Sequence, residues 1–254
     1  MGVASAKIRL FADMALVPGA EAVLPESPSH YLCTVMRLGA GNHLAVFNGR
    51  DGEYECTLIK PHKKNAVIRV NRQSRPFSAA PDLWLLFAPL KKDCTDFVLQ
   101  KAVELGASKI MPVLTANTVA GTVRLDRYQA QVIEAAEQCR RVDLPEVSAP
   151  RRLADILSAW EPGRRLFLMD ETGQGMPAAA AFEAEAGSPA AILVGPEGGF
   201  SPEEIDRLYA LPFVRGISLG PRILRAETAA AAALAVWQAV AGDWNPLITK
   251  EDRR

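Results

Sequence analysis

Hydrophobic and polar positions alternate in four short segments near the N-terminus. These are KIRLFA (7–12), NHLAVFN (42–48), GEYECTLI (52–59) and NAVIRVN (65–71). A period of two with Gly, Asn and Pro between the runs is typical of β-strands. Between the first two lies SPSHYLCTVMRLGAG, with helix-start residues at Ser27 and Pro28 and possible stops at Gly39 or Gly41. Residues 1–76 are therefore predicted to form a small barrel with one helix.

The pattern changes after RQSRPFSAAP (72–81), which is predicted to be a linker. Five apolar runs are then typical of strands: LWLLFAP (83–89), KIMPVL (109–114), RLFLMD (165–170), AAILV (190–194) and VRGISLG (214–220). Predicted helices are DCTDFVLQKAVELG (93–106), RYQAQVIEAAEQCRR (127–141), a segment from Ser201, and RAETAAAAALAVWQAVAG (225–242). Asp93 is the expected cap of the first and Gly106 its stop. This alternation predicts a larger α/β domain over residues 77–254.

The loop GPEGGF (195–200) joins a predicted strand to a predicted helix. Ser201, Pro202 and Glu204 match the N-cap, first and third positions of a capping box. The loop therefore lies at a strand's carboxyl end, where open α/β sheets bind ligands. It carries Glu197 and no lysine, so a neutral or cationic ligand fits better than a phosphate. A plain tight turn is an equally good interpretation of the glycines.

A second informative stretch is SLGPRILRAETAAAAALA (218–235). Arg222 and Arg225 are three residues apart and would share a face if the segment is helical. Glu227 and Thr228 open an alanine-rich helix whose small side chains allow close backbone approach. Surface ion pairs would also explain the arginines, and tight core packing the alanines.

Charge is unevenly distributed along a chain of net charge zero. Residues 1–76 hold ten Lys and Arg against six Asp and Glu, whereas the remainder holds 19 against 23. A basic small domain hints at a polyanionic partner, although solvated surface is an alternative. No apolar run has membrane-spanning length and no signal-peptide pattern is present, so a cytoplasmic location is expected.

Two other kinds of site receive little support. Four scattered cysteines and three histidines without ligand-like spacing predict neither a disulfide nor a metal site. GQGMPA (173–178) matches a dinucleotide fingerprint, which keeps a Rossmann-type, NAD-dependent oxidoreductase as an alternative function. However, Asp170-Glu171-Thr172 stand between the apolar run of the preceding strand and the first glycine, and Met176-Pro177 stand where a helix should approach a pyrophosphate.

LVGPEGGFSPEEI together with SLGPRILRAETA resembles the paired signature of the SPOUT methyltransferases. The closest resemblance is to the family that methylates N3 of one uridine in 16S ribosomal RNA. SHYLCTVMRLGAGNHLAVFNG is similar to that family's N-terminal RNA-binding barrel, and KKDCTDFVLQKAVELGASKIMPV and EAAEQCRR to its central segments. The resemblance implies a trefoil-knotted α/β domain after a PUA-like barrel, S-adenosylmethionine as cofactor, 16S rRNA in the small ribosomal subunit as partner, and a homodimer.

The resemblance also implies a set of site residues. Arg225 is expected to stabilise charge on the uracil, Arg222 to support the loop or the RNA, and Glu197 to act as base or to orient the cofactor. The cofactor-binding residues expected are Leu168, Gly195, Pro196, Glu197, Gly198, Gly199, Leu219, Gly220, Ile223, Leu224, Arg225, Glu227 and Thr228. The RNA-binding residues expected are Arg9, His30 and Arg37.

The sequence departs from the family pattern at one loop. Relatives often carry Ser-Glu-Arg after the KIMPV strand, whereas this chain has Thr115-Ala116-Asn117. The missing arginine places the expected charge stabilisation on Arg222 and Arg225. A non-catalytic RNA-binding protein, which would keep the barrel without cofactor affinity, remains a further alternative.

Overall fold

The computed structural model describes residues 8–119, 123–172 and 174–245. The chain divides into two compact units, and each is described by itself. The first comprises Met1–Ala79 together with Ile133–Leu144, and the second comprises Ala80–Val132 and Pro145–Arg254. The division after Ala79 falls inside the expected linker, whereas the assignment of Ile133–Leu144 to the first unit has no signal in the sequence.

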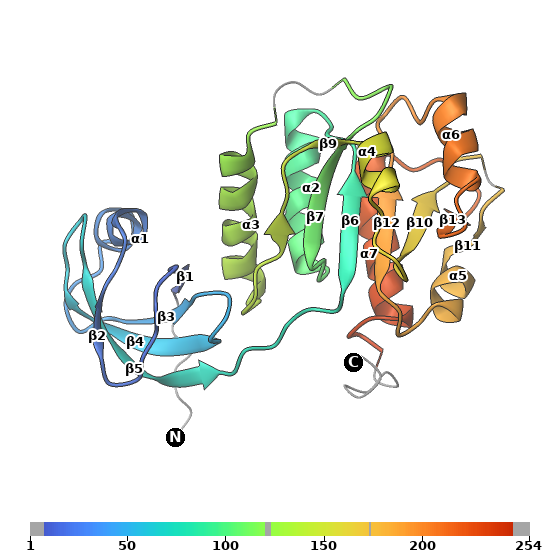
Figure 1. Ribbon diagram of the computed structural model, residues 1–254. Coiled ribbons are helices and arrows are strands. Elements are labelled where there is room, and N and C mark those ends of the chain that lie inside the picture. The colour runs from blue at the N-terminus through green and yellow to red at the C-terminus, as the bar shows by residue number, and fades with distance from the viewer. Residues whose placement is uncertain (1–7, 120–122, 173, 246–254) are drawn as a thin grey trace. The chain divides into compact units, whose positions relative to one another are not determined.

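The first unit contains a five-stranded sheet in the order β1-β3-β4-β5-β2 (Figure 1). Its strands are β1 (Arg9–Phe11), β2 (Glu21–Val23), β3 (His43–Phe47), β4 (Glu53–Lys60) and β5 (Val67–Arg75). β1 pairs with β3 in parallel and the other pairs are antiparallel. The four expected strands are present, although Lys7 lies outside the described residues. Residues 72–75 belong to β5 and pair with β4, so the predicted linker began four residues too early.

The helical segment of the first unit differs from its prediction at both ends. α1 (Glu26–His30) follows Pro25, and a π-helical turn, η1 (Tyr31–Val35), continues it. The segment is stopped by Arg37, whose φ of 53° is left-handed, rather than by Gly39 or Gly41. Ser29 and Leu32 face inward, and Leu32 joins the barrel core with Leu44, Leu58 and Ile68 among others.

The second unit is built on a parallel sheet in the order β11-β13-β10-β12-β6-β7-β8, with β9 also pairing with β7. Its strands are β6 (Leu83–Phe87), β7 (Lys109–Leu114), β8 (Glu146–Val147), β9 (Arg151–Arg152), β10 (Arg165–Met169), β11 (Met176–Pro177), β12 (Ala190–Val194) and β13 (Val214–Ser218). All five residues of β12 are buried, as its continuous apolar run predicts. The expected α/β architecture is therefore confirmed.

Helices accompany the strands. They are α2 (Lys92–Glu104), α3 (Leu125–Cys139), α4 (Leu153–Ser158), α5 (Ala178–Ala184), α6 (Pro202–Tyr209) and α7 (Ala226–Val240). Side chains of α4 and α6 share a core with alternate residues of the central strands, whereas α7 packs on β12 and beside α2 and α5. No helix among the described residues is long and apolar enough to cross a membrane.

Two helix starts test the capping predictions. Ser201 caps α6 as expected: its hydroxyl accepts the Glu204 N–H, and the Glu204 carboxylate accepts the Ser201 N–H. Asp93 is not the cap of α2, because the cap is Lys91 and the helix begins at Lys92, two residues earlier than predicted. Asp93 lies in the first turn instead, where its negative charge interacts favourably with the positive end of the helix dipole. Gly106 ends this helix region with a φ of 75°, as its position predicts.

Candidate active site

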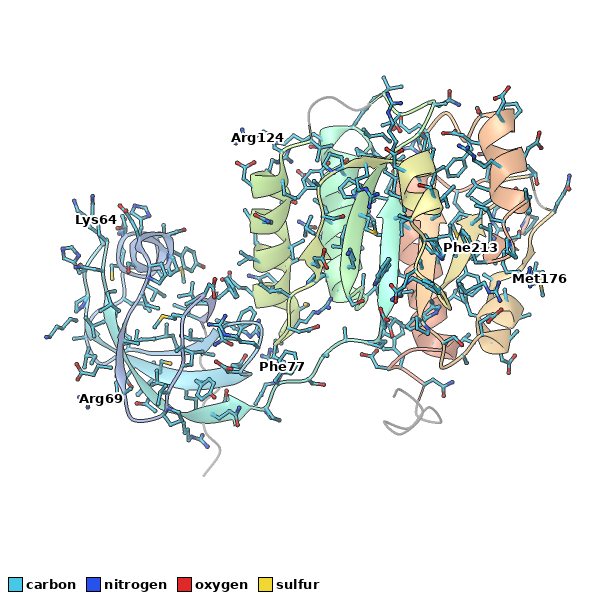
Figure 2. The ribbon with its side chains drawn as sticks, viewed as in Figure 1. Lys64, Arg69, Phe77, Arg124, Met176 and Phe213 are labelled. Atoms are coloured by element: carbon cyan, nitrogen blue, oxygen red, sulfur yellow. The ribbon has the colours of Figure 1, made fainter. Side chains whose placement is uncertain are left out.

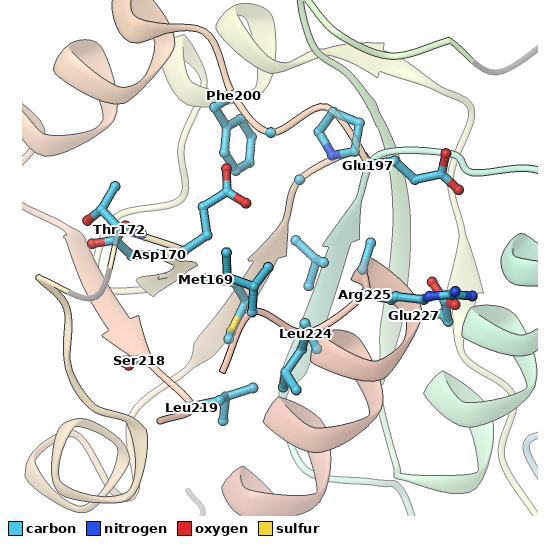
Figure 3. A pocket seen from close by; sticks show the side chains of 18 of the residues that line it. Met169, Asp170, Thr172, Glu197, Phe200, Ser218, Leu219, Leu224, Arg225 and Glu227 are labelled. Atoms are coloured by element: carbon cyan, nitrogen blue, oxygen red, sulfur yellow. The ribbon is translucent and has the colours of Figure 1, made fainter. Parts of the chain in front are cut away.

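A cavity of about 960 Å³ opens at the carboxyl ends of β10, β12 and β13 (Figure 3). The loops after these strands form its walls, and Lys91 and Cys94, at the start of α2, complete it. Because parallel strands end at the same edge of a sheet, loops far apart in the sequence meet at this place. The apolar side chains of the wall are Met169, Phe200, Ile205, Leu219, Ile223 and Leu224 among others.

The GPEGGF loop is held by close backbone packing. A Cβ on Gly195 would come within 2.8 Å of the Phe200 ring, so a side chain would displace that ring. Gly199 is buried and has a φ of 67°, a conformation that disfavours side chains. Its N–H bonds to the carbonyl of Pro196 at 3.0 Å, which closes the turn. These glycines therefore bring bare backbone to the cavity wall.

The segment Thr115-Ala116-Asn117 supports this loop from outside. The Ala116 N–H donates to Glu204 Oε1 at 2.8 Å. The Asn117 side-chain amide donates to the carbonyls of Gly198 and Gly199, each at 3.2 Å. The tripeptide supports the loop through these hydrogen bonds and does not line the cavity.

The loop that carries the two arginines is not helical. Residues 221–225 precede α7, so the condition under which Arg222 and Arg225 would share a helical face is not met. Both nevertheless line the cavity. Arg225 is the N-cap of α7 with extended backbone angles, φ −63° and ψ 151°. Gly220, with a φ of 105°, makes the turn that directs the chain into this loop.

Carboxylates outnumber cations in the cavity wall. The wall contains Asp170, Glu171, Glu197, Asp206 and Glu227 against Lys91, Arg222 and Arg225. This excess favours a cationic ligand over a polyphosphate, in agreement with the expectation from Glu197 alone. The described residues contain no cluster of three or more His, Cys, Asp or Glu side chains placed to hold a metal ion.

Charged groups gather at one side of the cavity, where Figure 3 shows Glu197, Arg225 and Glu227. The pKa of the Cys94 thiol is raised by partial burial, by the neighbouring Glu227 carboxylate and by the charge of Glu197, while Arg225 opposes the shift. Cys94 therefore remains a neutral thiol among these charges. The side chain of Arg225 makes no hydrogen bond or ion pair with any residue that the structure describes.

Asp170 anchors the opposite wall directly after β10. Its carboxylate accepts the Tyr209 hydroxyl at 2.6 Å and the Thr172 N–H at 2.8 Å. Burial opposes ionisation of Asp170, but the hydrogen bonds from Tyr209, Thr172 and Gly175 outweigh it and lower its pKa. Burial and the bond to Asp170 together raise the pKa of Tyr209 to about 12.

Most of the expected cofactor-binding residues come together in this cavity, with three exceptions. Leu168 is fully buried in the core under α4 and α6, and its neighbour Met169 lines the cavity instead. Gly198 faces Asn117, with the site of an added Cβ 3.5 Å from the Asn117 Cβ. Thr228 is exposed on α7 outside the wall.

Other wall residues were missed, chiefly Cys94, Met169, Asp170 and Glu171. The one usable signal was the carboxylate of Asp170 directly after a buried strand, at the edge where ligands bind. Cys94 had no signal, because its place in the wall depends on the packing of α2 beside α7.

The three residues expected to bind RNA have different environments in the first unit. The Arg9 side chain is 10% exposed, and its guanidinium pairs with Glu53 at 2.5 Å, stacks on the Phe47 ring and donates to backbone carbonyls. It therefore holds the unit together and is not free for RNA. His30 and Arg37 are exposed, and their side chains have no partner among the described residues.

The dinucleotide fingerprint has a packing explanation. Gly173 lies outside the described residues, but a Cβ on Gly175 would come 2.7 Å from the backbone of Ile217. Met176-Pro177 then form β11, which pairs with β13. The glycine is required because two strands approach closely, and no helix begins at the glycines to receive a pyrophosphate.

Comparisons with known proteins agree with this site. The model of an RNA methyltransferase domain matches residues 78–238, and that of an RNA methyltransferase PUA domain matches residues 24–71. Ribosomal RNA small subunit methyltransferase E of Rickettsia conorii is 32% identical over 206 residues, covering 81% of this chain and 84% of the relative. The chain belongs to this methyltransferase family. The protein of the same name from a Synechocystis species is also 32% identical, over 85% of this chain and 72% of the relative.

Solved structures of the family share the fold. A putative methyltransferase from Legionella pneumophila, in complex with the cofactor SAM, is 29% identical with a TM-score of 0.85 and covers 95% of this chain and 100% of that chain. The methyltransferase E of Neisseria gonorrhoeae, bound to S-adenosyl methionine, is 26% identical with a TM-score of 0.82, covering 94% and 99%. These comparisons confirm a PUA-like domain followed along the chain by a SPOUT-type α/β domain, whereas the trefoil knot stays a prediction.

Proposed function

We propose that this chain transfers a methyl group from S-adenosylmethionine to N3 of one uridine in 16S ribosomal RNA. The observation that carries the proposal is the cavity itself. It combines bare glycine backbone, an apolar wall and an excess of carboxylates with Arg225, whose side chain makes no ion pair with any described residue. Membership of the methyltransferase E family and the cofactor-bound relatives support the same chemistry.

The cavity fits S-adenosylmethionine on three grounds. Its volume of about 960 Å³ lies within the range of small-molecule sites, about 300–1,000 Å³. The backbone of Gly195 and Gly199 and the side chains of Leu219 and Leu224 would hold the adenosine part. The carboxylate excess tolerates a sulfonium cation, and the bound cofactor supplies an electrophilic methyl group.

Arg225 is proposed to stabilise the negative charge that develops on the uracil. N3 of a neutral uracil carries a proton and is a poor nucleophile, so that proton must leave and the resulting charge spreads over O2 and O4. A preorganised cationic donor stabilises such charge more effectively than water does. Because the Arg225 side chain has no partner among the described residues, its donors are available to the substrate. Arg222, exposed on the same loop, would support the loop or the RNA.

Glu197 is proposed as the group that receives the N3 proton or orients the cofactor. Its carboxylate is exposed at the side of the cavity that Arg225 and Glu227 also occupy (Figure 3). A general base must lie within hydrogen-bond reach of the proton it removes. If solvent takes the proton instead, replacing Glu197 with Gln will leave the pH dependence of the transfer rate unchanged.

Recognition and chemistry are proposed to reside in different domains. Residues 1–76 would bind RNA, with His30 and Arg37 in contact with it, and residues 77–254 would carry the cofactor and the reaction. Phosphate contacts give affinity that falls steeply with salt, which suits a basic domain. We further propose that the protein acts as a homodimer on the small ribosomal subunit in the cytoplasm. Light scattering at micromolar concentration measures the dimer directly.

Two titrations and one transfer assay test the proposal. Calorimetry of the full-length protein should detect binding of S-adenosylmethionine and none of NAD. Tritium from labelled S-adenosylmethionine should then enter 16S rRNA of small subunits that lack the modification, with naked RNA as a parallel substrate. Binding of NAD alone would favour the oxidoreductase. RNA binding without cofactor binding would favour a non-catalytic protein.

A further inference from the structure

The positive charge of the first unit is compensated unevenly. All six carboxylates in residues 8–76 are in ion pairs with cations, namely Asp13 and Asp51 with Arg50, Glu21 with Arg69, Glu26 with Lys64, Glu53 with Arg9, and Glu55 with Arg72. The described cations of this range that have no carboxylate partner are Arg37, Lys60, Lys63 and Arg75. Arg75 donates to the carbonyl of Arg140. The free excess therefore lies at Arg37, Lys60 and Lys63.

Arg37 follows η1 closely, Lys60 ends β4, and Lys63 lies in the turn between β4 and β5. The turn between β4 and β5 reaches α1, because Lys64 Nζ is 3.6 Å from the Glu26 carboxylate and the Ala66 N–H donates to Ser29 Oγ at 2.9 Å. The chain after Arg37 returns beside β4 through a bond of 2.8 Å from the Gly41 N–H to the Leu58 carbonyl. In Figure 2, Lys64 lies beside α1, whereas Arg69, the third residue of β5 and paired with Glu21, lies farther from α1.

The same segment exposes large apolar side chains. Tyr31 is 38% exposed, Val35 58% and Met36 40%, while Leu32 between them is fully buried. The Met36 N–H bonds to the Tyr31 carbonyl five residues back, so one wide turn carries all three. Apolar side chains grouped on a surface commonly mark a binding site. We call Tyr31, Val35 and Met36, with Arg37, Lys60 and Lys63, the basic–apolar face.

We propose that the basic–apolar face binds unpaired nucleotides of the RNA substrate. The proposal rests on the proposed function and deepens it. Uncompensated cations attract phosphates, and an exposed aromatic ring with apolar neighbours offers a surface on which splayed bases stack. A duplex hides the faces of its bases and would leave Tyr31, Val35 and Met36 without a partner. Charge and apolar surface together therefore select a single-stranded or looped segment.

Salt dependence of RNA binding tests the charged part of the face. The probe is a fluorescein-labelled, 20-nucleotide single-stranded RNA of mixed sequence, bound to the full-length protein and followed by anisotropy. The variant Lys60→Gln/Lys63→Gln removes two uncompensated charges, and its matched control Arg69→Gln/Arg72→Gln removes two paired ones. Each lost phosphate contact lowers the slope of log K against log salt by about 0.7. If both lysines contact phosphates, the slope of log K against log salt should be smaller in magnitude by about 1.4 for Lys60→Gln/Lys63→Gln than for wild type. The control variant should have the wild-type slope.

Substitution of Tyr31 tests the stacking part. Tyr31→Ala should weaken binding of the single-stranded probe roughly 5- to 150-fold, since one stacked base contributes about 1–3 kcal/mol. Tyr31→Phe keeps the ring and should bind as wild type, which separates stacking from loss of fold. Binding of the duplex of the same sequence should not respond to either change. Thermal melting of each variant accompanies the binding curves.

Several results would overturn the proposal. Equal slopes for the two double variants, or an unchanged affinity of Tyr31→Ala for the single-stranded probe, would show that the face does not bind RNA. Normal RNA binding with weaker sedimentation on intact small subunits would assign the face to a protein partner instead. Affinity for S-adenosylmethionine, measured on the same variants, should be unchanged. If wild type binds RNA but no cofactor, the proposed function fails while the face is still tested.

Discussion

Arg225 is both the first residue of the turn into α7 and a member of the cavity wall. Its side chain makes no capping bond, so removing it should not weaken the helix. We expect Arg225→Ala to lower kcat for methyl transfer about 100- to 1,000-fold, because one transition-state donor is lost. Affinity for S-adenosylmethionine, measured by calorimetry, should change little.

Arg225→Lys is the matched control, because it keeps the charge and removes the planar fork of donors. It should recover only part of the rate. If Arg225→Ala transfers methyl groups within a few-fold of wild type, the arginine is structural and the charge on the uracil must be stabilised elsewhere.

Gly199 and Gly198 give a paired test of the cofactor loop. Valine at position 199 would need a left-handed backbone and would meet the Glu171 carboxylate, so Gly199→Val should weaken S-adenosylmethionine binding at least tenfold. Gly198 has no positive φ, and an added Cβ makes only an ordinary contact with Asn117. Gly198→Ala should therefore bind the cofactor as wild type does. Calorimetry measures the affinity of the two folded variants for S-adenosylmethionine. Equal affinities of Gly199→Val and Gly198→Ala would show that the loop does not form part of the cofactor site.

The sequence was informative about single residues wherever a local motif surrounded them. Glu197, Arg222 and Arg225 stand in two short signatures and line the cavity as expected. Leu168 was misplaced because alternation along a strand turns each neighbour to the opposite face, and the cavity receives Met169 instead. Cys94 and Asp170 line the cavity through contacts that form only when distant elements pack.

At the level of elements, the hydrogen bond between Tyr209 and Asp170 ties the end of α6 to the end of β10. Tyr209→Phe should lower the free energy of unfolding by about 1 kcal/mol at pH 7, as for one bond to a charged group at a partly exposed site. The pKa of Asp170 is lowered in the folded state, so its contribution is complete above the ordinary carboxyl value near 3.9 and is lost at lower pH.

The difference in stability between wild type and Tyr209→Phe should therefore shrink as the pH falls from about 5 to 3. Urea unfolding at several pH values measures it. A difference that stays constant over this range would mean that the bond does not hold Asp170 in its ionised form.

Elements with strong local signals were predicted well, and short ones were not. The buried run of β12 and the capping box of α6 are set by residues within a few positions of each other. β2, β8, β9 and β11 have two or three residues each, too few to show a period. The spacing of Arg222 and Arg225 left open whether residues 221–225 are helical, and the turn favoured by Gly220-Pro221 is what the structure has.

For the molecule as a whole, Ile133–Leu144 belong to the first compact unit although they come after its other residues in the sequence. This assignment affects the stability expected of a protein truncated at its N-terminus. Ala136 and Val142 are buried in the full chain. A protein that begins at Ala80 would remove the rest of their unit and leave these side chains uncovered. We expect it to keep the cofactor cavity, to lose the salt-dependent RNA affinity, and to melt several degrees earlier, at about 2–4 °C per kcal/mol lost.

Scanning calorimetry with a cofactor titration on the truncated protein checks this expectation. A melting temperature equal to that of the full chain would show that Ile133–Leu144 is stable without the first 79 residues. Methylation of RNA at the wild-type rate would show that the N-terminal domain is not needed for recognition.

The arrangement of the whole chain was the part least accessible to sequence patterns. Periodicity separates a strand-rich N-terminal segment from an α/β segment, but it cannot show that one stretch of α3 joins the first unit. Strand order likewise follows from packing between distant segments. The resemblance to a known family supplied the SPOUT-type and PUA-like domains, which the relatives then confirmed.

Mapping of 16S rRNA tests the central claim most directly. Ribosomal RNA from a strain that lacks this protein would be digested and analysed by mass spectrometry, beside RNA from the same strain carrying the wild-type chain or Arg225→Ala. We expect one N3-methyluridine to disappear in the deletion strain, to return with the wild-type chain, and to return weakly or not at all with the variant. An unchanged set of methylated uridines in the deletion strain would contradict this expectation.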